Sequence, residues 1–333
     1  MCLRSTARAL RRRLNDAARA VKAFSRRARW SATLRPRAST IERIKARKAI
    51  RHAAGAAYVD HPRVSVIVQS FNQVRNISVL EPRLRATCTD ELIVCEDGSI
   101  DGSHSEWMGR LVQPNDFLLR SNDIHEIRSY GRAIAYSRGD IVCLMQDDDQ
   151  PPKDGRWLAD ALALFNEYPG LAVLGGWCGF DEWFSVEYNA PWQPPGAGAI
   201  PLADARTGQP FVFVENVNIG PYLVRRSTFD ELGGFDLRFS PPGEPGITFE
   251  AEFCYRAWES GYQVALTDIP VKLETGELGY IFPGGTTLWG NDARKRNEHR
   301  NKGLIEERYE HAMPAIREAV SEANALLKAA QGD

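Results

Sequence analysis

The sequence lacks several features that would place it in other classes of protein. No apolar run approaches the roughly 18 residues of a membrane-spanning helix, and the first residues show no apolar core of a secretory signal. The six cysteines form no C-x-x-C pair and have no ligand-like spacing with the six histidines. We therefore expect free thiols in a reducing, cytoplasmic compartment, and no zinc site.

Acidic residues are nearly absent from the first part of the chain. Residues 1–59 hold 17 Lys and Arg against two acids, a formal charge of +15, whereas residues 60–333 carry 25 basic and 41 acidic residues, a formal charge of −16. Apolar residues at steps of three and four between Leu3 and Phe24 predict an amphipathic helix. A basic helical extension over residues 1–60 can lie on an anionic membrane.

Other interpretations of this extension remain open. It can equally be a solvated tail, an organelle transit peptide or a nucleic-acid-binding arm. We favour binding of residues 1–55 to the inner face of a membrane, and nucleic acid is the less favoured partner.

The texture of the sequence changes at Arg63, where short apolar runs begin to alternate with longer helical segments. This alternation is typical of a βαβ sheet, and 32 aromatic residues supply bulk for its core. We predict strands at 64–68, 91–95 and 140–145. The last two run directly into polar segments, 96–102 and 146–152, and ligands of open α/β sheets bind beyond the carboxyl ends of strands.

The segment 146–152 is the more informative of the two, because it contains three consecutive aspartates, Asp147, Asp148 and Asp149. Their charges repel one another unless a cation neutralises them, and Mg²⁺ or Mn²⁺ prefers carboxylate and phosphate oxygens. A solvated acidic turn is the alternative. A calcium-binding EF-hand is excluded because the twelfth position counted from Asp147 is Leu158.

Five segments, taken in order, are similar to the family-2 glycosyltransferases over roughly residues 63–270. The resemblance implies an α/β fold of the GT-A type, a doubly wound, mostly parallel sheet flanked by helices. Its nucleotide-binding half would span 61–150 and its acceptor half 151–290, followed by a helical segment at 291–333. The segments are VSVIVQSFNQ (64–73), ELIVCEDGSID (91–101), GDIVCLMQDDD (139–149), GGFD (233–236) and FEAEFCYRAWESGY (249–262).

The resemblance also implies an activity, which is transfer of a sugar from a nucleoside-diphosphate donor to an acceptor hydroxyl with inversion. It implies a divalent metal, Mn²⁺ or Mg²⁺, a carbohydrate or other hydroxyl acceptor, and a setting such as polysaccharide biosynthesis. Gln69 and Phe71 match positions that line the base pocket of the family. Asp97 matches an aspartate that recognises the base, typically uracil, through a ring N–H.

The metal motif of the family, Asp-x-Asp, aligns with Gln146-Asp147-Asp148, so its first acid is a glutamine here. The resemblance implies that Asp148 binds the metal with Asp149 beside it, while Asp147 contacts the donor. Arg128 and Arg132 begin a predicted helix that often contacts phosphates in this family. Ordinary surface charges are the alternative for these two arginines.

The candidate catalytic base lies in the segment Phe249–Glu252. By resemblance, Glu250 occupies the position of the usual catalytic aspartate and Glu252 that of a second acid, whereas Phe249 replaces the first acid of the motif. Such a base takes the proton of the acceptor hydroxyl. Residues two apart point to different sides of a helix, so we expect at most one of the two to face the cleft. Surface acids favoured by a helix dipole are the alternative.

Two further segments could contact the acceptor or the diphosphate. Residues 177–209, with Trp183 and Trp192, predict either an acceptor loop with stacking aromatic rings or a packed surface loop. A returning strand is expected at 216–225. The cations of 289–300 predict either a lid over the diphosphate or a solvated helix; they are Arg294, Lys295, Arg296 and Arg300.

Two rival functions remain. A nucleotidyltransferase would share a sheet and a metal-binding acid, but residues 69–76 (QSFNQVRN) lack the expected loop rich in glycine and lysine. A catalytically silent nucleotide-sugar-binding module is the alternative without an enzymatic activity, and it is favoured by Gln146 and Phe249.

Overall fold

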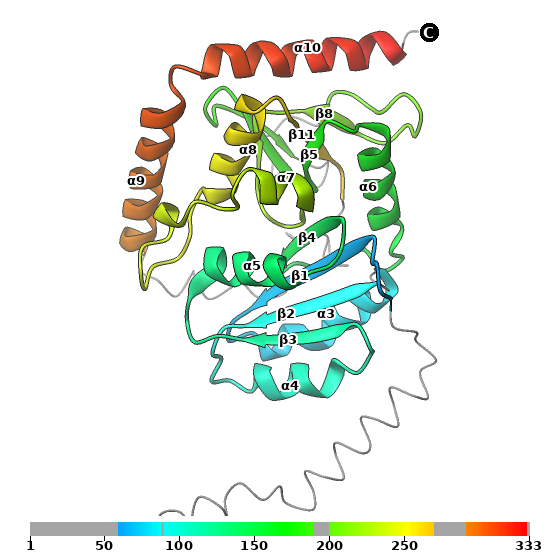
Figure 1. The fold of residues 1–333 in the computed structure, drawn as a ribbon, viewed down its shortest axis with the longest axis vertical. Helices are drawn as coiled ribbons and strands as arrows, with labels where there is room; N and C mark the ends of the chain where they lie inside the picture. Colours follow the sequence, from blue (N-terminus) through cyan, green and yellow to red (C-terminus); the bar gives the residue numbers. More distant parts are fainter. Residues whose placement is uncertain (1–58, 88–89, 190–199, 270–290, 332–333) are drawn as a thin grey trace, which may run out of the picture. The chain divides into compact units, whose positions relative to one another are not determined.

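The computed structural model describes residues 59–87, 90–189, 200–269 and 291–331. The basic extension, with its expected membrane association, lies outside the described residues, as do Trp192 and residues 270–290. The chain divides into two units, 1–56 and 57–333. The second unit is built on an eight-stranded sheet with the strand order β3-β2-β1-β4-β10-β5-β11-β8 (Figure 1).

The first half of the sheet consists of four parallel strands. All seven residues of β1 are buried, and a continuous β-branched run fits a strand covered on both faces. Figure 1 shows α5 on the near face of these strands, where it contacts β1 and β2. The strands predicted at 64–68, 91–95 and 140–145 are present as β1, β2 and β4. The strands are β1 (Val64–Ser70), β2 (Glu91–Glu96), β3 (Asp116–Arg120) and β4 (Ile141–Gln146).

The chain order of these strands creates a crevice. The chain runs outward from β1 to β2 and β3, and then returns to add β4 on the other side of β1. At such a switch point the connections leave the strands in opposite directions, which opens a ligand-binding crevice beyond their carboxyl ends. The carboxyl ends of the two strands lie next to each other here, because Gln69, the second-last residue of β1, pairs with Gln146, the last residue of β4.

The second half of the sheet mixes orientations. β5 (Leu171–Gly175) and β11 (Gln263–Thr267) are parallel, whereas β10 (Tyr222–Arg225) is antiparallel to β4 and β5. β8 (Phe211–Phe213) is antiparallel to β11. The whole is a mostly parallel α/β sheet flanked by helices, as the resemblance implied.

One predicted strand differs from the structure. Residues 216–225 form two strands, because Gly220, with φ of 117°, and Pro221 separate β9 (Asn216–Val217) from β10. Proline has no N–H for a strand ladder, so the chain leaves one sheet and enters the other at this point. β9 pairs with β6 (Cys178–Asp181), which also pairs with β7 (Val186–Asn189), in a small three-stranded sheet.

Helices complete the unit, and the last three pack on one another or on the sheet. α8 contacts β9 and β11, α9 contacts α8, and α10 contacts α8 and β8. Among the described helices, none combines the length and the apolar character needed to cross a membrane. The helices are α3 (Val74–Thr87), α4 (Ser103–Arg110), α5 (His125–Tyr136), α6 (Arg156–Glu167), α7 (Arg226–Glu231), α8 (Phe249–Glu259), α9 (Asn291–Tyr309) and α10 (Met313–Gln331).

The unusual Phe249 is a core residue. Its side chain is 3% exposed, and its ring meets that of Phe235 edge-on with 4.9 Å between the centroids. Phe229 and Phe253 complete this aromatic cluster around the start of α8. The apolar residue in place of an acid therefore anchors the helix that carries Glu250. The described cysteines are all buried, and none of them forms a disulfide; they are Cys95, Cys143, Cys178 and Cys254.

Candidate active site

A cavity of about 590 Å³ lies beyond the carboxyl end of β4. Residues from both halves of the unit and from α9 line it, so segments that are far apart in the sequence meet there. Its polar side chains include five acids and two cations, and both cations come from α9. The lining residues are Glu126, Gln146, Asp148, Asp149, Trp177, Phe180, Phe184, Asn218, Ile219, Gly246, Ile247, Thr248, Phe249, Glu250, Arg294, Glu298 and Lys302.

The loop after β4 directs the side chains of the three aspartates to different parts of the structure. Asp148 and Asp149 line the cavity, and all three residues are buried. Asp147 turns toward β1, where its Oδ2 accepts a hydrogen bond from the backbone N–H of Phe71 at 2.8 Å. Oδ2 of Asp149 accepts one from the N–H of Gln146 at 2.7 Å. The loop therefore ties β4 to β1 through Asp147 and presents the other two carboxylates to the cavity.

Burial makes the ionised form of these carboxylates unfavourable. Burial, and then the neighbouring charge of Asp148, raises the pKa of Asp147 to about 8. The same two causes raise the pKa of Asp149 well above its ordinary value. A bound cation would reverse both effects, because it favours the ionised form.

The residues present fit a divalent metal bound jointly by the protein and by a phosphate. Two neighbouring carboxylates face the cavity, and Mg²⁺ or Mn²⁺ commonly takes one or two carboxylates plus substrate phosphates. Within the described residues, no three His, Cys, Asp or Glu side chains form a cage for a metal. Gln146, which replaces an acid of the family motif, also lines the cavity and can offer only a neutral oxygen.

Glu250 lies in the first turn of α8 and lines the same cavity as Asp148 and Asp149. Its Oε2 is buried and has no hydrogen-bond partner among the described residues. Burial, with a smaller effect from the charge of Glu126, raises the pKa of Glu250 to about 7. A carboxylate of this kind can accept a proton near neutral pH.

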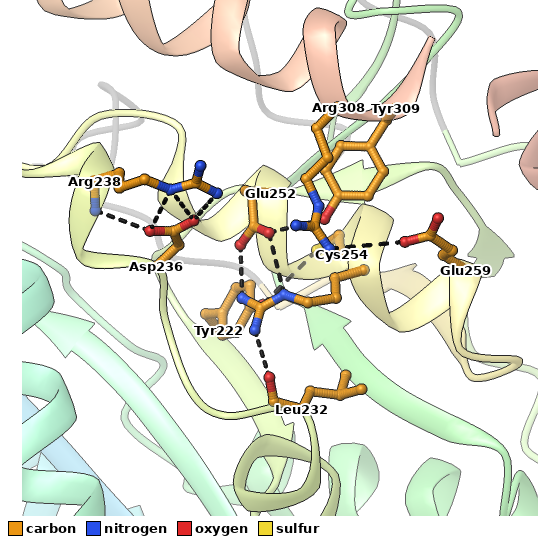
Figure 2. A network of polar contacts seen from close by, with 10 residues as sticks. Tyr222, Leu232, Asp236, Arg238, Glu252, Cys254, Glu259, Arg308 and Tyr309 are labelled. Carbon is orange, nitrogen blue, oxygen red and sulfur yellow. Dashed lines mark hydrogen bonds and ion pairs between the residues drawn. The ribbon is translucent and has the colours of Figure 1, made fainter. Parts of the chain in front are cut away.

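Glu252 points away from the cavity, as expected for a residue two positions from Glu250. It forms an ion pair with Arg256 at 2.6 Å and accepts a hydrogen bond from the hydroxyl of Tyr309 at 2.8 Å. Arg256 also donates to the carbonyl oxygen of Leu232, as Figure 2 shows. Glu252 is thus part of a structural network that joins α8 to α9.

The residues expected to contact the nucleotide lie around the ends of β1 and β2, outside the cavity lining. Gln69 is buried in β1, and Phe71 follows that strand. Asp97 is 1% exposed, and its two carboxylate oxygens accept the N–H groups of Ile124 and His125 at 3.0 and 2.8 Å. Asp97 therefore fixes the start of α5. Each of its carboxylate oxygens keeps a second lone pair that can accept another hydrogen bond.

Arg128 and Arg132 lie on α5 but line a different cavity, of about 700 Å³, between α5 and the residues around α7. Nη1 of Arg128 donates to the carbonyl oxygen and to Oγ of Ser240, at 2.8 and 2.9 Å. Arg128 thus fixes the segment before α8, and the structure does not bring the two arginines into the cavity with Asp148.

Glu126 is a cavity residue that sequence reasoning missed. It lies in the first turn of α5, and its Oε2 accepts a hydrogen bond from the N–H of Gly246 at 3.1 Å. Burial raises its pKa, and the charge of Asp97 adds to this effect. An acid at the start of a helix is ordinary, so the sequence offered no signal. Among the cations expected on α9, Arg294 lines the cavity together with Lys302, which had not been singled out.

Comparison with known proteins finds a matching family model and several similar solved structures. Residues 65–195 match the family model described as Glycosyl transferase family 2. Similar solved structures include the mannosyltransferase PcManGT from Pyrobaculum calidifontis in complex with GDP-Man and Mn²⁺, with 14% identity, a TM-score of 0.45, and coverage of 69% of this chain and 65% of that one.

Two further structures have comparable scores. S. aureus TarS 1–349 has 17% identity, a TM-score of 0.42 and coverage of 61% of this chain and 57% of TarS. GalNAc-T7 with UDP, GalNAc and Mn²⁺ has 14% identity, a TM-score of 0.43 and coverage of 62% and 43%. The chain thus spans less than two thirds of the length of each of these structures. The family match agrees, over residues 65–195, with the resemblance to family-2 glycosyltransferases carried by the sequence motifs.

Proposed function

We propose that this protein transfers a sugar from a nucleoside-diphosphate donor to an acceptor hydroxyl, with inversion at the anomeric carbon and assistance from a divalent metal. The observation that carries the proposal is the shared cavity of Asp148, Asp149 and Glu250. The reaction needs metal-binding carboxylates and a proton acceptor at one reaction centre. Asp148 and Glu250, about 100 positions apart in the sequence, line one cavity. The family match over 65–195 supports the same reaction class.

Glu250 acts as the general base in this proposal. Its Oε2, which has no hydrogen-bond partner among the described residues, accepts the hydroxyl proton of the acceptor. At the same time the acceptor oxygen bonds to the anomeric carbon and the bond to the diphosphate breaks. A pKa of about 7 keeps a large share of Glu250 ionised at neutral pH and makes it a stronger base than an ordinary glutamate. A single displacement from the face opposite the leaving group inverts the configuration.

Asp148 and Asp149 hold the metal, which when bound offsets negative charge growing on the departing diphosphate. Gln146 adds a neutral ligand or a hydrogen bond to the donor. Gln69, Phe71 and Asp97, around the ends of β1 and β2, bind the nucleotide of the donor. Phe71 can stack on the base, and Asp97 selects a base with a ring N–H, as in UDP-sugars. Asp147 supports this side through its bond to the N–H of Phe71.

The test measures release of nucleoside diphosphate from a panel of UDP- and GDP-sugars, with Mn²⁺, with Mg²⁺ and with chelator. We expect metal-dependent release that Asp148→Asn abolishes, while the matched control Asp154→Asn, an exposed residue outside the cavity, retains it. No release with any donor from folded protein would favour the silent binding module. Release of pyrophosphate from nucleoside triphosphates would favour a nucleotidyltransferase.

A further inference from the structure

The turn between β6 and β7 has an unusual backbone conformation. Glu182, Trp183 and Phe184 are consecutive residues, none of them glycine, with φ values of 50°, 56° and 69°. Single residues other than glycine adopt this left-handed conformation at a cost, and a run of three is retained only where surrounding contacts enforce it. The turn therefore depends on its neighbours for its shape.

A buried carboxylate supplies these contacts. Glu215 is 1% exposed, and its Oε1 and Oε2 accept the N–H groups of Glu182 and Trp183 at 2.8 and 3.2 Å. Asp181 accepts the N–H of Glu215 at 2.7 Å, which locks the two segments together. Nε of Arg317, on α10, donates to Oε1 of Glu215 at 3.0 Å and compensates its charge. The turn is thus clamped from outside the cavity.

The clamped turn directs successive side chains to opposite sides. Trp183 packs toward the core against Tyr255, with ring centroids 5.7 Å apart. Phe184 instead lines the candidate active-site cavity beside Phe180, with centroids 5.3 Å apart. The left-handed run therefore brings Phe184 into the cavity, next to Phe180 of β6.

A third residue of this aromatic wall lies near Asp149. Trp177 also lines the cavity, and Gly220 lies between it and Asp149. A Cβ at Gly220 would lie 3.0 Å from Oδ1 of Asp149 and 3.2 Å from Nε1 of Trp177, so a side chain here would crowd both the acid and the indole. The wall thus begins beside the site assigned to the metal.

Polar side chains complete the rest of the cavity. Asn218, Glu298 and Lys302 line it, and Nζ of Lys302 lies 5.1 Å from the ring centroid of Phe184. A cavity lined both by aromatic rings and by hydrogen-bonding groups suits a sugar ring, whose C–H face is apolar and whose rim carries hydroxyls. A flexible polyol or an alkyl alcohol presents no such face.

We propose that Trp177, Phe180 and Phe184 form the acceptor subsite, that the acceptor is a saccharide with a pyranose ring, and that Glu215 and Arg317 are positioning residues that hold this subsite in shape. This inference rests on the proposed transferase function, since it assigns the acceptor to the same cavity. Arg317 lies outside the cavity and acts through Glu215.

The first experiment identifies the acceptor class. Methyl glycosides of glucose, galactose, mannose and N-acetylglucosamine are compared with glycerol and ribitol, as accelerators of donor cleavage and as ligands in saturation-transfer NMR. We expect a pyranoside to accelerate cleavage and to receive saturation at its ring protons, with loss of this transfer in Phe184→Leu. Acceleration by the acyclic polyols alone, or no ring saturation with any pyranoside, would overturn the proposal.

The second experiment separates the acceptor from the donor. Phe184→Leu should raise the acceptor KM about 3- to 10-fold, a larger change than in the donor KM. Arg317→Ala should raise the acceptor KM in the same direction, Arg317→Lys should restore it in part, and the adjacent exposed Glu318→Ala should have no effect. Equal changes in donor and acceptor KM would contradict the assignment.

The two proposals fail in different ways. If the wild-type protein cleaves no donor, the transferase proposal fails, and the NMR arm still decides whether the aromatic wall binds a pyranoside. If donor cleavage is metal-dependent but Phe184→Leu and Arg317→Ala leave the acceptor KM unchanged, the acceptor subsite lies elsewhere and only this inference fails.

Discussion

Tyr309, at the end of α9, donates its hydroxyl hydrogen to Oε1 of Glu252 in α8, with 2.8 Å between the oxygens. The same carboxylate pairs with Arg256 of its own helix (Figure 2). α8 carries Glu250, and α9 carries Arg294, which lines the same cavity. The buried bond therefore joins the two helices that bring these residues to the cavity.

Removal of that bond should lower stability. Tyr309→Phe leaves a buried carboxylate with one hydrogen bond fewer, and we expect the free energy of unfolding in urea to fall by about 1–2 kcal/mol. Glu252→Gln should cost more, about 3 kcal/mol, because Arg256, whose side chain is 15% exposed, then loses its countercharge. Donor turnover per folded molecule should change little in either variant. A Glu252→Gln protein of parental stability that has lost turnover would instead make Glu252 catalytic.

Replacement of the base should separate chemistry from donor binding. Glu250→Gln keeps the size of the side chain but cannot take a proton, so we expect transfer to fall by about 10²- to 10⁴-fold. The dissociation constant for donor and metal, measured by calorimetry, should stay within a factor of about three. Glu259→Gln, at the other end of the same helix, is the matched control and should retain the parental rate. A near-parental rate for Glu250→Gln would move the base to another residue.

The rate should also depend on pH in a defined direction. Because burial raises the pKa of Glu250 to about 7, the proton-accepting form is lost as the pH falls through that value. We expect kcat/KM to rise with pH up to about 7 and to decrease about tenfold per pH unit below it. The charge of Glu126 raises this pKa and that of Arg294 lowers it. Glu126→Gln should therefore shift the acidic limb to lower pH, and Arg294→Gln should shift it to higher pH.

The strands, and the position of Asp148 and Asp149 beyond the end of β4, could be predicted because their signals are local. β1, β2 and β4 are continuous apolar runs since both of their faces are covered, and the polar residues that follow must lie at one edge of a parallel sheet. That geometry alone brings Asp148 and Asp149 to a crevice. The helical period likewise separates Glu250 from Glu252, although it does not say which of them faces inward.

The remaining features depend on partners that are remote in the sequence. Glu126 bonds to Gly246, Arg128 to Ser240, and Glu215 to Arg317, each pair more than 100 residues apart. A charged residue on a helix has the same local signature whether it faces water or a distant backbone group. For this reason the sequence could not indicate that Arg128 fixes a loop or that Glu126 belongs to the cavity.

The basic extension offers a separate prediction. Residues 1–55 carry nearly all of the excess positive charge, and the chain divides into units at residues 56 and 57, so their deletion should leave the melting temperature of the second unit unchanged. The full chain should sediment with vesicles that contain anionic phospholipid, less so as salt is raised, because cations near such a surface contribute about 1 kcal/mol each. The deleted protein should remain in the supernatant, and neither should bind neutral vesicles strongly. Equal sedimentation of both proteins with anionic vesicles would assign membrane binding to the second unit instead.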